Sequence, residues 1–402
     1  MSCLGPGCAA LSRTSGRNRA PPQCCRSSVQ PLASRPIRYS GQHPRRATVV
    51  GAGSFGTAVA VLIDRAGIRT TLLCRTREQA EELSDAHQNR RYLPGVQLPR
   101  DLKVSHFGAD REDLRRSDLI LLAVPSEGIG DAIDELRRLG VPDRAGIVSL
   151  AKGLVPPDGA TPTALLDVAF GPERVACVGG PAHAREMVES GAGLVCASRS
   201  EALAHRVAEA FQRAGVVCEV SDDPVGVELA GVAKNAAAVA VGATQAQGLN
   251  AAGMAAADIF LEVLSLSAAS GGQARTFVGR AGTGDLVATA LAPMSRNRSA
   301  GELLAEGVPA AEIPERVGQA VEALETVPVL ARAIERAGVE APVTSALARL
   351  IEGTLPVDDW VALVRAKQPP PASFRRPSTW WVRLKAWFGR QFGGRSLDSE
   401  KQ

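Results

Sequence analysis

Two lysines occupy positions at which an amine could transfer a proton. The chain has six lysines against 40 arginines, so arginine is its usual cation. Lys234 lies within a run of alanine, glycine and valine that predicts a buried helix. Burial lowers the pKa of a lysine and suits it to acid/base catalysis near neutral pH. We therefore interpret Lys234 as a candidate acid/base, with a solvated lysine that snorkels out of the helix as the alternative.

Other segments place polar groups in glycine-rich or loop settings. Lys152 and the turn Gly179–Pro181 each follow a predicted strand, at the sheet edge where open α/β proteins bind ligands. Asp285 follows two glycines, and Thr289 lies one helical turn beyond it. The segment Ser295–Arg298 supplies donors of the kind that bind a phosphate or a carboxylate. Taken alone, a helix cap or a surface loop explains the last two segments equally well.

The glycines Gly51, Gly53 and Gly56 predict a dinucleotide-binding turn. They form the pattern GxGxxG between the short apolar run Ala47–Val50 and the periodic apolar run Thr57–Ala66. In this setting the first glycine permits the turn, the second lets the backbone approach a pyrophosphate, and the third lets the helix pack on the strand. The helix N-terminus then favours the negative charge of the pyrophosphate. An ordinary glycine-rich turn is the alternative.

The end of the next predicted strand indicates which dinucleotide binds. An NAD site usually carries an acidic residue about 20 residues beyond the glycines, where it binds the ribose 2′-hydroxyl. This chain has Arg75 and Arg77 instead, and no acid before Glu78. The two arginines suit a 2′-phosphate, so NADP(H) is the preferred cofactor and NAD(H) remains possible. Two solvated arginines at a helix start are the alternative.

The elements around these residues predict an α/β fold: an N-terminal Rossmann-type, doubly wound parallel sheet followed by an all-α C-terminal domain. Residues 47–220 alternate short apolar strands with helical segments, which is typical of a parallel sheet with helices on both faces. Residues 221–368 are predicted to form the helical substrate and catalytic domain. The predicted strands are Thr48–Gly51, Thr70–Cys74, Leu119–Ala123, Gly146–Leu150, Val175–Val178, Gly193–Ala197 and Val216–Val220.

The two ends of the chain differ in composition from its body. Residues 1–46 hold eight arginines and no acidic residue, and we expect a disordered basic extension; a transit peptide or a start codon placed too far upstream are alternatives. Residues 1–46 carry a net charge of +8 and residues 369–402 a net charge of +5. Subtracting both from the formal charge of +4 for the whole chain leaves −9 for residues 47–368. This acidic body argues against nucleic acid as a partner.

Cysteine and histidine form no metal or disulfide pattern. Four of the eight cysteines lie in residues 1–46, and the other four stand singly in apolar runs, where cysteine packs as a small hydrophobe. No CxxC pair occurs and the five histidines are scattered, so we expect no metal site. We find no apolar run of about 20 residues and no signal-peptide core. These features predict a cytoplasmic protein.

The order of the motifs resembles that of the NAD(P)-dependent glycerol-3-phosphate dehydrogenases of the bacterial type. The resemblance runs from about residue 48 to about residue 353. Each motif is modest alone, but all of them in this order are highly specific. In chain order they are Gly51–Ala58, Asn89–Gly95, Ala123–Ser126, Ala151–Gly153, Gly180–Glu186, Lys234–Asn235, Gly282–Leu286, Ser295–Arg298 and Gly318–Glu322.

The resemblance implies a reversible reduction of dihydroxyacetone phosphate to sn-glycerol 3-phosphate, which feeds glycerophospholipid synthesis. Lys234 would protonate the C2 carbonyl oxygen as hydride arrives from the nicotinamide, Asp285 would hold and tune Lys234, and Lys152 would add positive charge near the developing alkoxide. The implied substrate-binding residues are Lys152, Gly180, Asn235, Asp285, Thr289, Ser295, Arg296 and Asn297. The implied cofactor-binding residues are Gly51, Gly53, Ser54, Phe55, Gly56, Arg75, Lys152, Ala184, Arg296, Ala320 and Glu322.

Two positions depart from the family pattern. Ala182 stands where a serine or threonine is usual, which removes a hydroxyl contact to the substrate. Asp258 stands where an arginine is usual, and an acid near a phosphate pocket would repel substrate. A related dehydrogenase with a shifted small-molecule substrate is therefore an alternative. A catalytically silent dinucleotide-binding regulator is a further alternative, but the presence of Lys152, Lys234 and Asp285 argues against it.

We also expect the protein to form a homodimer.

The C-terminal segment 369–402 is predicted to be a Pro-rich linker and a basic amphipathic tail. Bulky apolar residues recur at positions 380, 381, 384, 387, 388 and 392, which is helical spacing, with Arg383, Lys385 and Arg390 largely off that stripe. A basic amphipathic helix with Trp and Phe can lie in a membrane interface, so weak peripheral membrane contact through residues 380–392 is one hypothesis. Docking on the protein's own body or on a second subunit is the alternative.

Overall fold

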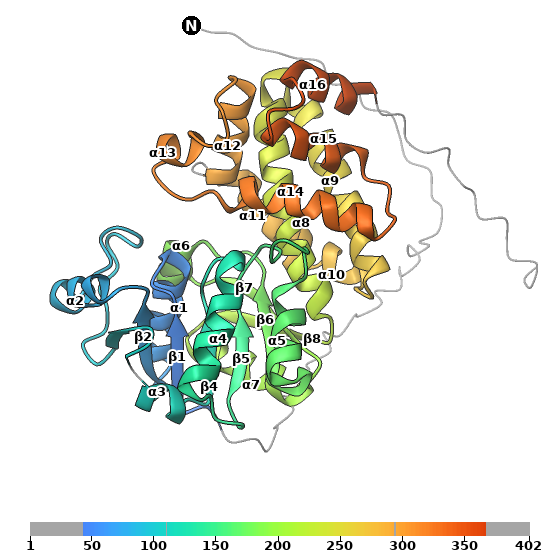
Figure 1. Ribbon diagram of the computed structural model, residues 1–402. Coiled ribbons are helices and arrows are strands. Elements are labelled where there is room, and N and C mark those ends of the chain that lie inside the picture. Colours follow the sequence, from blue (N-terminus) through green and yellow to red (C-terminus); the bar gives the residue numbers. More distant parts are fainter. Residues whose placement is uncertain (1–42, 110, 293–294, 367–402) are drawn as a thin grey trace, which may run out of the picture. The chain divides into compact units, whose positions relative to one another are not determined.

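A computed structural model describes residues 43–109, 111–292 and 295–366 (Figure 1). The predicted extension therefore lies almost entirely outside the described residues, and the predicted tail lies wholly outside them. Eight strands form one sheet in the order β3-β2-β1-β4-β5-β6-β7-β8. The strands are β1 (Arg46–Val50), β2 (Arg69–Cys74), β3 (Lys103–His106), β4 (Leu119–Leu122), β5 (Gly146–Ser149), β6 (Val175–Gly179), β7 (Gly193–Ser198) and β8 (Val217–Ser221).

The α/β fold class is confirmed, but the sheet differs from the prediction in two respects. Strand β3 was not predicted, because Lys103–His106 is a mostly polar edge strand with little apolar signal. Strand β7 runs antiparallel to β6, so the sheet is mixed rather than wholly parallel. The apolar pattern of a strand buried on both faces does not record its direction, which depends on how the chain returns to the sheet.

Helices cover both faces of the sheet. Successive residues of a strand point to opposite sides, and both sides of these strands carry apolar side chains that need to be buried. Val49 and Leu72 belong to one buried cluster, whereas Val50 and Leu73 belong to another. The doubly wound prediction thus holds. The helices among the strands are α1 (Ser54–Arg65), α2 (Arg77–Ala86), α3 (Arg111–Arg116), α4 (Ile129–Leu139), α5 (Pro162–Phe170), α6 (Ala184–Ser190) and α7 (Glu201–Arg213), with 3₁₀ turns η1 (Ser126–Gly128) and η2 (Pro172–Arg174).

From Pro224 onward the described residues form helices joined by turns and loops, with no strand among them. Helix α8 is nearly all buried, and Gly242 allows it to approach α12 closely, since a Cβ there would meet the Arg298 carbonyl. The predicted division at residue 220 stays a prediction. The elements are α8 (Pro224–Thr244), η3 (Gln245–Gln247), α9 (Leu249–Ala269), α10 (Ala274–Val278), the π-helical turn η4 (Arg280–Gly284), α11 (Asp285–Leu291), α12 (Arg296–Ala305), α13 (Ile313–Val317), α14 (Glu322–Arg336), α15 (Pro342–Ile351) and α16 (Val357–Ala366).

Two helices correct the expectation that no apolar run is long enough to span a membrane. Pro224–Gln247 and Leu249–Ala269 are long and apolar enough by length and composition alone. In the first, 83% of the apolar window is buried, as in the core helix of a globular protein. In the second, 44% is buried, so α9 keeps an apolar surface that the described protein does not cover.

Candidate active site

The glycine-rich turn has the geometry that a dinucleotide requires. Gly51 has φ of +107°, and a Cβ there would collide with the carbonyl of Ala123 at the end of β4. A Cβ on Gly56 would collide with the carbonyl of Gly51, so this glycine lets α1 pack on the turn. A Cβ on Gly53 would meet nothing within 4 Å. The turn is therefore closed on the protein side and open on the side where a pyrophosphate would lie.

The N-terminus of α1 is available to an anion. Gly53 is its N-cap residue, no described side chain caps it, and its first turn holds no acidic residue. The Ser54 hydroxyl donates to the carbonyl oxygen of Tyr92 at 2.5 Å. Because that proton is already used, we expect the backbone N–H groups of this turn, rather than the Ser54 hydroxyl, to bind a pyrophosphate. Phe55 is partly buried beside them.

Asn89 holds the glycine-rich turn in place, a role that sequence reasoning missed. Its buried amide donates to the carbonyl of Ala52 at 2.9 Å and to the Thr57 hydroxyl at 2.8 Å. Its Oδ1 accepts from the backbone N–H of Tyr92 at 3.2 Å. The segment Asn89–Gly95 was part of the family resemblance, but a hydrogen bond to a turn 37 residues earlier leaves no local pattern in the sequence.

The two arginines at the end of β2 differ in their surroundings. Arg77 begins α2, and its Nε lies 2.8 Å from Oε1 of Glu81, one helical turn further on. Arg75 is exposed directly after β2, and no ion pair of it is seen among the described residues. Arg75 is thus better suited than Arg77 to meet a 2′-phosphate.

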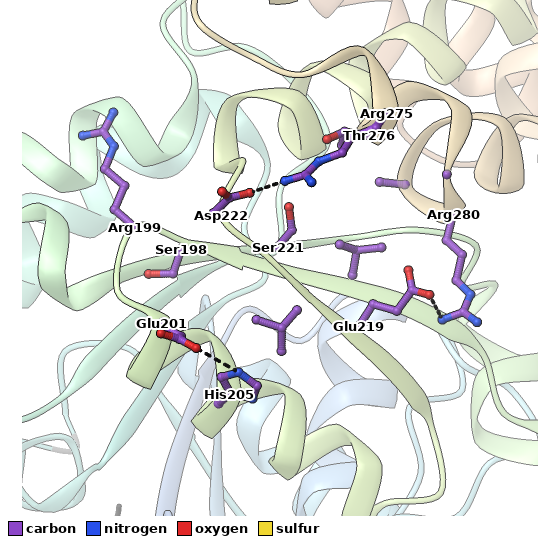
Figure 2. Close-up of a pocket in the computed structure, with 14 residues that line it drawn as sticks. Ser198, Arg199, Glu201, His205, Glu219, Ser221, Asp222, Arg275, Thr276 and Arg280 are labelled. Atoms are coloured by element: carbon purple, nitrogen blue, oxygen red, sulfur yellow. Dashed lines mark hydrogen bonds and ion pairs between the residues drawn. The ribbon is translucent and has the colours of Figure 1, made fainter. Parts of the chain in front are cut away.

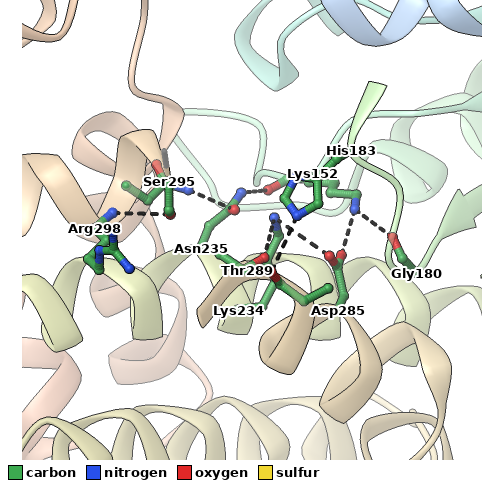
Figure 3. Close-up of polar contacts among 11 residues, drawn as sticks. Lys152, Gly180, His183, Lys234, Asn235, Asp285, Thr289, Ser295 and Arg298 are labelled. Atoms are coloured by element: carbon green, nitrogen blue, oxygen red, sulfur yellow. Dashed lines mark hydrogen bonds and ion pairs between the residues drawn. The ribbon is translucent and has the colours of Figure 1, made fainter. Parts of the chain in front are cut away.

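Four elements bring the candidate catalytic groups together (Figure 3). Lys152 follows β5 and Gly180 follows β6, at the carboxyl edge of the sheet. Lys234 lies on α8, and Asp285 is the first residue of α11, directly after the π-helical turn. Such turns are frequent at functional sites. The predicted residues are therefore neighbours in space although more than 130 positions separate Lys152 from Asp285.

Asp285 lies between the two lysines. Its Oδ2 is 2.5 Å from Nζ of Lys152, and its Oδ1 is 3.8 Å from Nζ of Lys234. Lys152 also donates to the carbonyl of Gly180 at 2.9 Å, and Lys234 donates to the Thr289 hydroxyl at 3.4 Å. All three charged side chains are largely enclosed, with exposed fractions of 17% for Lys152, 13% for Lys234 and 4% for Asp285.

Burial lowers the pKa of Lys234 to about 8. The negative charge of Asp285 opposes this shift, whereas the positive charge of Lys152 adds to it, as does that of Arg296. An ammonium with a pKa near the working pH can both give and accept a proton, which is what reversible acid/base catalysis needs.

A chain of amides links this cluster to the start of α12. Asn235 donates to the carbonyl of Lys152 at 3.1 Å, and Asn297 donates to Oδ1 of Asn235 at 2.8 Å. Ser295 is the N-cap of α12, where its hydroxyl accepts from the backbone N–H of Arg298 at 3.4 Å. Arg296 is exposed and donates to the carbonyl of Ala320 at 3.1 Å. The predicted phosphate-binding residues thus adjoin the lysine cluster through Asn235.

The other predicted positions lie at helix starts. Ala184 begins α6 and Glu322 begins α14, two residues after the exposed Ala320. Among residues without a predicted role, His183 lies in the site's polar network, where its Nε2 is 3.3 Å from the carbonyl of Ala288 (Figure 3). Asp258 lies partly buried on α9, and its predicted effect on substrate stays a prediction.

A cavity of about 550 Å³ lies elsewhere, beside the edge strand β8 (Figure 2). Its charged groups already pair: Arg275 with Asp222 at 2.8 Å, and Arg280 with Glu219 at 2.6 Å. Neither lysine of the cluster lines it. The polar network around Lys234, rather than this cavity, is therefore the candidate active site. In the described part of the chain no group of three or more His, Cys, Asp or Glu residues could hold a metal ion, and the absence of a metal stays a prediction.

Comparison with known proteins decides the family. Residues 46–204 match the model of the N-terminal region of NAD-dependent glycerol-3-phosphate dehydrogenase, and residues 223–362 match that of its C-terminal region. A glycerol-3-phosphate dehydrogenase [NAD(P)+] of Parafrankia sp. is 36% identical over 332 residues, covering 81% of this chain and 98% of the relative. The chain belongs to the glycerol-3-phosphate dehydrogenase family. The predicted family is confirmed.

Other glycerol-3-phosphate dehydrogenases are similar to this chain in sequence or in structure. The relative from Deinococcus radiodurans is 38% identical over 315 residues, covering 76% of this chain and 90% of its own length. The crystal structure of the Coxiella burnetii glycerol-3-phosphate dehydrogenase has a TM-score of 0.72 and 28% identity, covering 80% of this chain and 99% of that one. The Plasmodium falciparum enzyme also has a TM-score of 0.72, and at 15% identity it supports the fold alone.

Proposed function

We propose that this protein reduces dihydroxyacetone phosphate reversibly to sn-glycerol 3-phosphate with NAD(P)H, and that the product serves glycerophospholipid synthesis. The observation that carries the proposal is the enclosed Lys152–Asp285–Lys234 cluster, which adjoins Asn297 and the start of α12. A ketone reduced by hydride needs one proton at its oxygen and electrostatic help as charge develops there.

The nicotinamide of NAD(P)H would supply the hydride, and the turn around Gly53 fits the pyrophosphate of that cofactor. Lys234 gives its proton to the C2 oxygen of the substrate and takes it back in the oxidation direction. Lys152 places a second positive charge near that oxygen. Asp285 orients both ammonium groups, since each of its oxygens faces one of them.

The substrate's phosphate would bind at the start of α12. Arg296 and Asn297 supply the donors, and Ser295 lies beside them as the N-cap. Thr289 and Asn235 would hydrogen-bond the hydroxyl and carbonyl groups. We further propose that Arg75 favours NADP(H), that no nucleic acid binds, and that the protein acts in the cytoplasm as a homodimer. The hypothesis of membrane contact falls on residues outside the described part of the chain.

The decisive experiment measures NADPH oxidation by the purified protein with dihydroxyacetone phosphate and, in parallel, with a panel of 2-oxoacids. Turnover confined to dihydroxyacetone phosphate supports the proposal. Turnover only with a 2-oxoacid would show that the protein is a related dehydrogenase with a different substrate, the alternative that Ala182 and Asp258 suggest. Cofactor binding without turnover of any substrate would favour the silent regulator.

A further inference from the structure

Helix α9 has an apolar face that the described protein leaves exposed. Leu249 is 84% exposed, Leu261 56% and Met254 44%, and Ala257 between them is exposed as well. Met254, Ala257 and Leu261 follow helical spacing along one side of the helix, and Leu249 is its first residue; we term these four residues the α9 face. The opposite side is fully buried through Ile259 and Val263. Contiguous exposed apolar surface of this kind marks an interaction site.

The end of the described chain lies beside this helix. Helix α16 ends at Ala366, and its buried residues Trp360 and Val364 pack in the same cluster as Ile259 and Val263 of α9. Residues 367–379 separate Ala366 from the first tryptophan of the tail. An extended chain of that length spans roughly 40 Å, whereas a helix of 21 residues such as α9 is about 31 Å long. The tail can therefore reach any part of the α9 face.

The composition of the tail suits this face. Within residues 380–392 the apolar residues recur with helical spacing, and the charged residues are Arg383, Lys385 and Arg390, all positive. The body of the protein has a net charge of −9 over residues 47–368, and Asp258 lies on α9 between Met254 and Leu261. The family model covers residues 223–362, so α9 lies within the matched region and the tail lies beyond it.

We propose that residues 380–392 bind the α9 face as an amphipathic helix, with Trp380, Trp381, Trp387 and Phe388 covering Leu261 and Met254. Apolar side chains at helical spacing on the tail then pack on the exposed apolar side chains of α9. The basic residues of the tail face the acidic body. Docking of the tail shields the apolar surface of α9 from solvent and from other proteins.

Tryptophan fluorescence of the full chain tests the proposal directly. Three of the four tryptophans lie in the tail, and the fourth, Trp360, is fully buried and serves as a constant background. We expect blue-shifted emission and low quenching by acrylamide in the unaltered protein. Leu261→Arg should shift the emission to the red and raise the quenching constant severalfold. The matched control is Val168→Arg, which alters a residue that is 87% exposed on α5 and should change neither.

Three further outcomes would overturn the proposal. Solvent-exposed emission that Leu261→Arg leaves unchanged would mean that the tail does not dock. A sedimentation coefficient lowered by Leu261→Arg, with unchanged tryptophan emission, would assign the α9 face to a second copy. Emission that turns blue only when vesicles rich in phosphatidylserine are added would assign the tail to a membrane. As an independent check, a chain truncated after Lys367 should show faster hydrogen exchange along α9 than the full chain, and equal exchange would also contradict docking.

Discussion

Asp285 joins Lys152 and Lys234 through different oxygens of one carboxylate, at 2.5 Å and 3.8 Å. The shorter contact commits Oδ2 to Lys152, while Lys234 stays at a distance from Oδ1 that still favours its ammonium form. One carboxylate therefore positions the ammonium of Lys152 and tunes that of Lys234, whose pKa is about 8.

Lys234→Ala should lower the rate of dihydroxyacetone phosphate reduction by about 10²–10⁴-fold, because it removes the proton donor. The dissociation constant of NADPH, measured by fluorescence titration, should change little, since the predicted cofactor turn at the start of α1 does not include Lys234. Lys103→Ala is the matched control: Lys103 is a half-exposed lysine on β3. A Lys234 variant with more than half the original activity would exclude this lysine from the mechanism.

The rates of substrate reduction and of the reverse oxidation should depend on pH in opposite ways. Reduction needs the ammonium form of Lys234 and should decline as pH rises through about 8, whereas oxidation should increase over the same range. Asp285→Asn removes the negative charge that raises this pKa, so both inflections should move to lower pH. The measurement is kcat/KM against pH for both proteins. Inflections that stay in place would show that Asp285 does not tune Lys234.

Arg75→Asp should shift cofactor preference from NADPH toward NADH. Losing a charged partner of the 2′-phosphate costs about 1.5–3 kcal/mol, or roughly 10–160-fold in the ratio of kcat/KM values. Arg77→Asp serves as the comparison and should have a smaller effect, because Arg77 already pairs with Glu81. If Arg77→Asp has the larger effect, the assignment of the two arginines is reversed.

Asn89→Ala should raise KM for NADPH by about tenfold while leaving kcat nearly unchanged, because the turn loses the amide that holds Ala52. Gln79→Ala should do less, since Gln79 donates to the same carbonyl at the longer distance of 3.3 Å. Steady-state kinetics and a thermal unfolding curve separate the two roles. A lowered Tm with an unchanged KM would make Asn89 a stabilising residue only.

Glu228→Gln should flatten the dependence of stability on pH. Burial raises the pKa of Glu228 to about 7, although the backbone N–H of Thr163, 3.0 Å from Oε1, opposes the shift. The folded state therefore favours the protonated carboxyl, and stability should fall as pH rises from about 4.5 through 7, by about 1.4 kcal/mol per unit of pKa difference. Urea unfolding at pH 5 and pH 8 checks this. If the unaltered protein and the Glu228→Gln variant lose the same free energy of unfolding between pH 5 and pH 8, Glu228 is not responsible for the pH dependence.

Local patterns in the sequence determined the fold class, the glycine-rich turn and the identity of the lysines. The turn at Gly51 is readable because strand, turn and helix are contiguous, and Lys234 stands out because its neighbours are alanine and valine. The motif order also placed the chain in its family. These features are set by residues within one or two elements of each other.

The tertiary structure alone decided which groups meet and in which direction strands run. The 2.5 Å contact between Lys152 and Asp285 joins residues that are 133 positions apart in the chain. The hydrogen bond from the Asn89 amide to the carbonyl of Ala52 joins residues that are 37 positions apart. The antiparallel course of β7 and the polar edge strand β3 also left no local signal. The pKa of Lys234 depends on burial by several elements at once, and α9 has an exposed apolar face only because its neighbours cover the other side. Such properties arise from long-range packing, which local spacing does not encode.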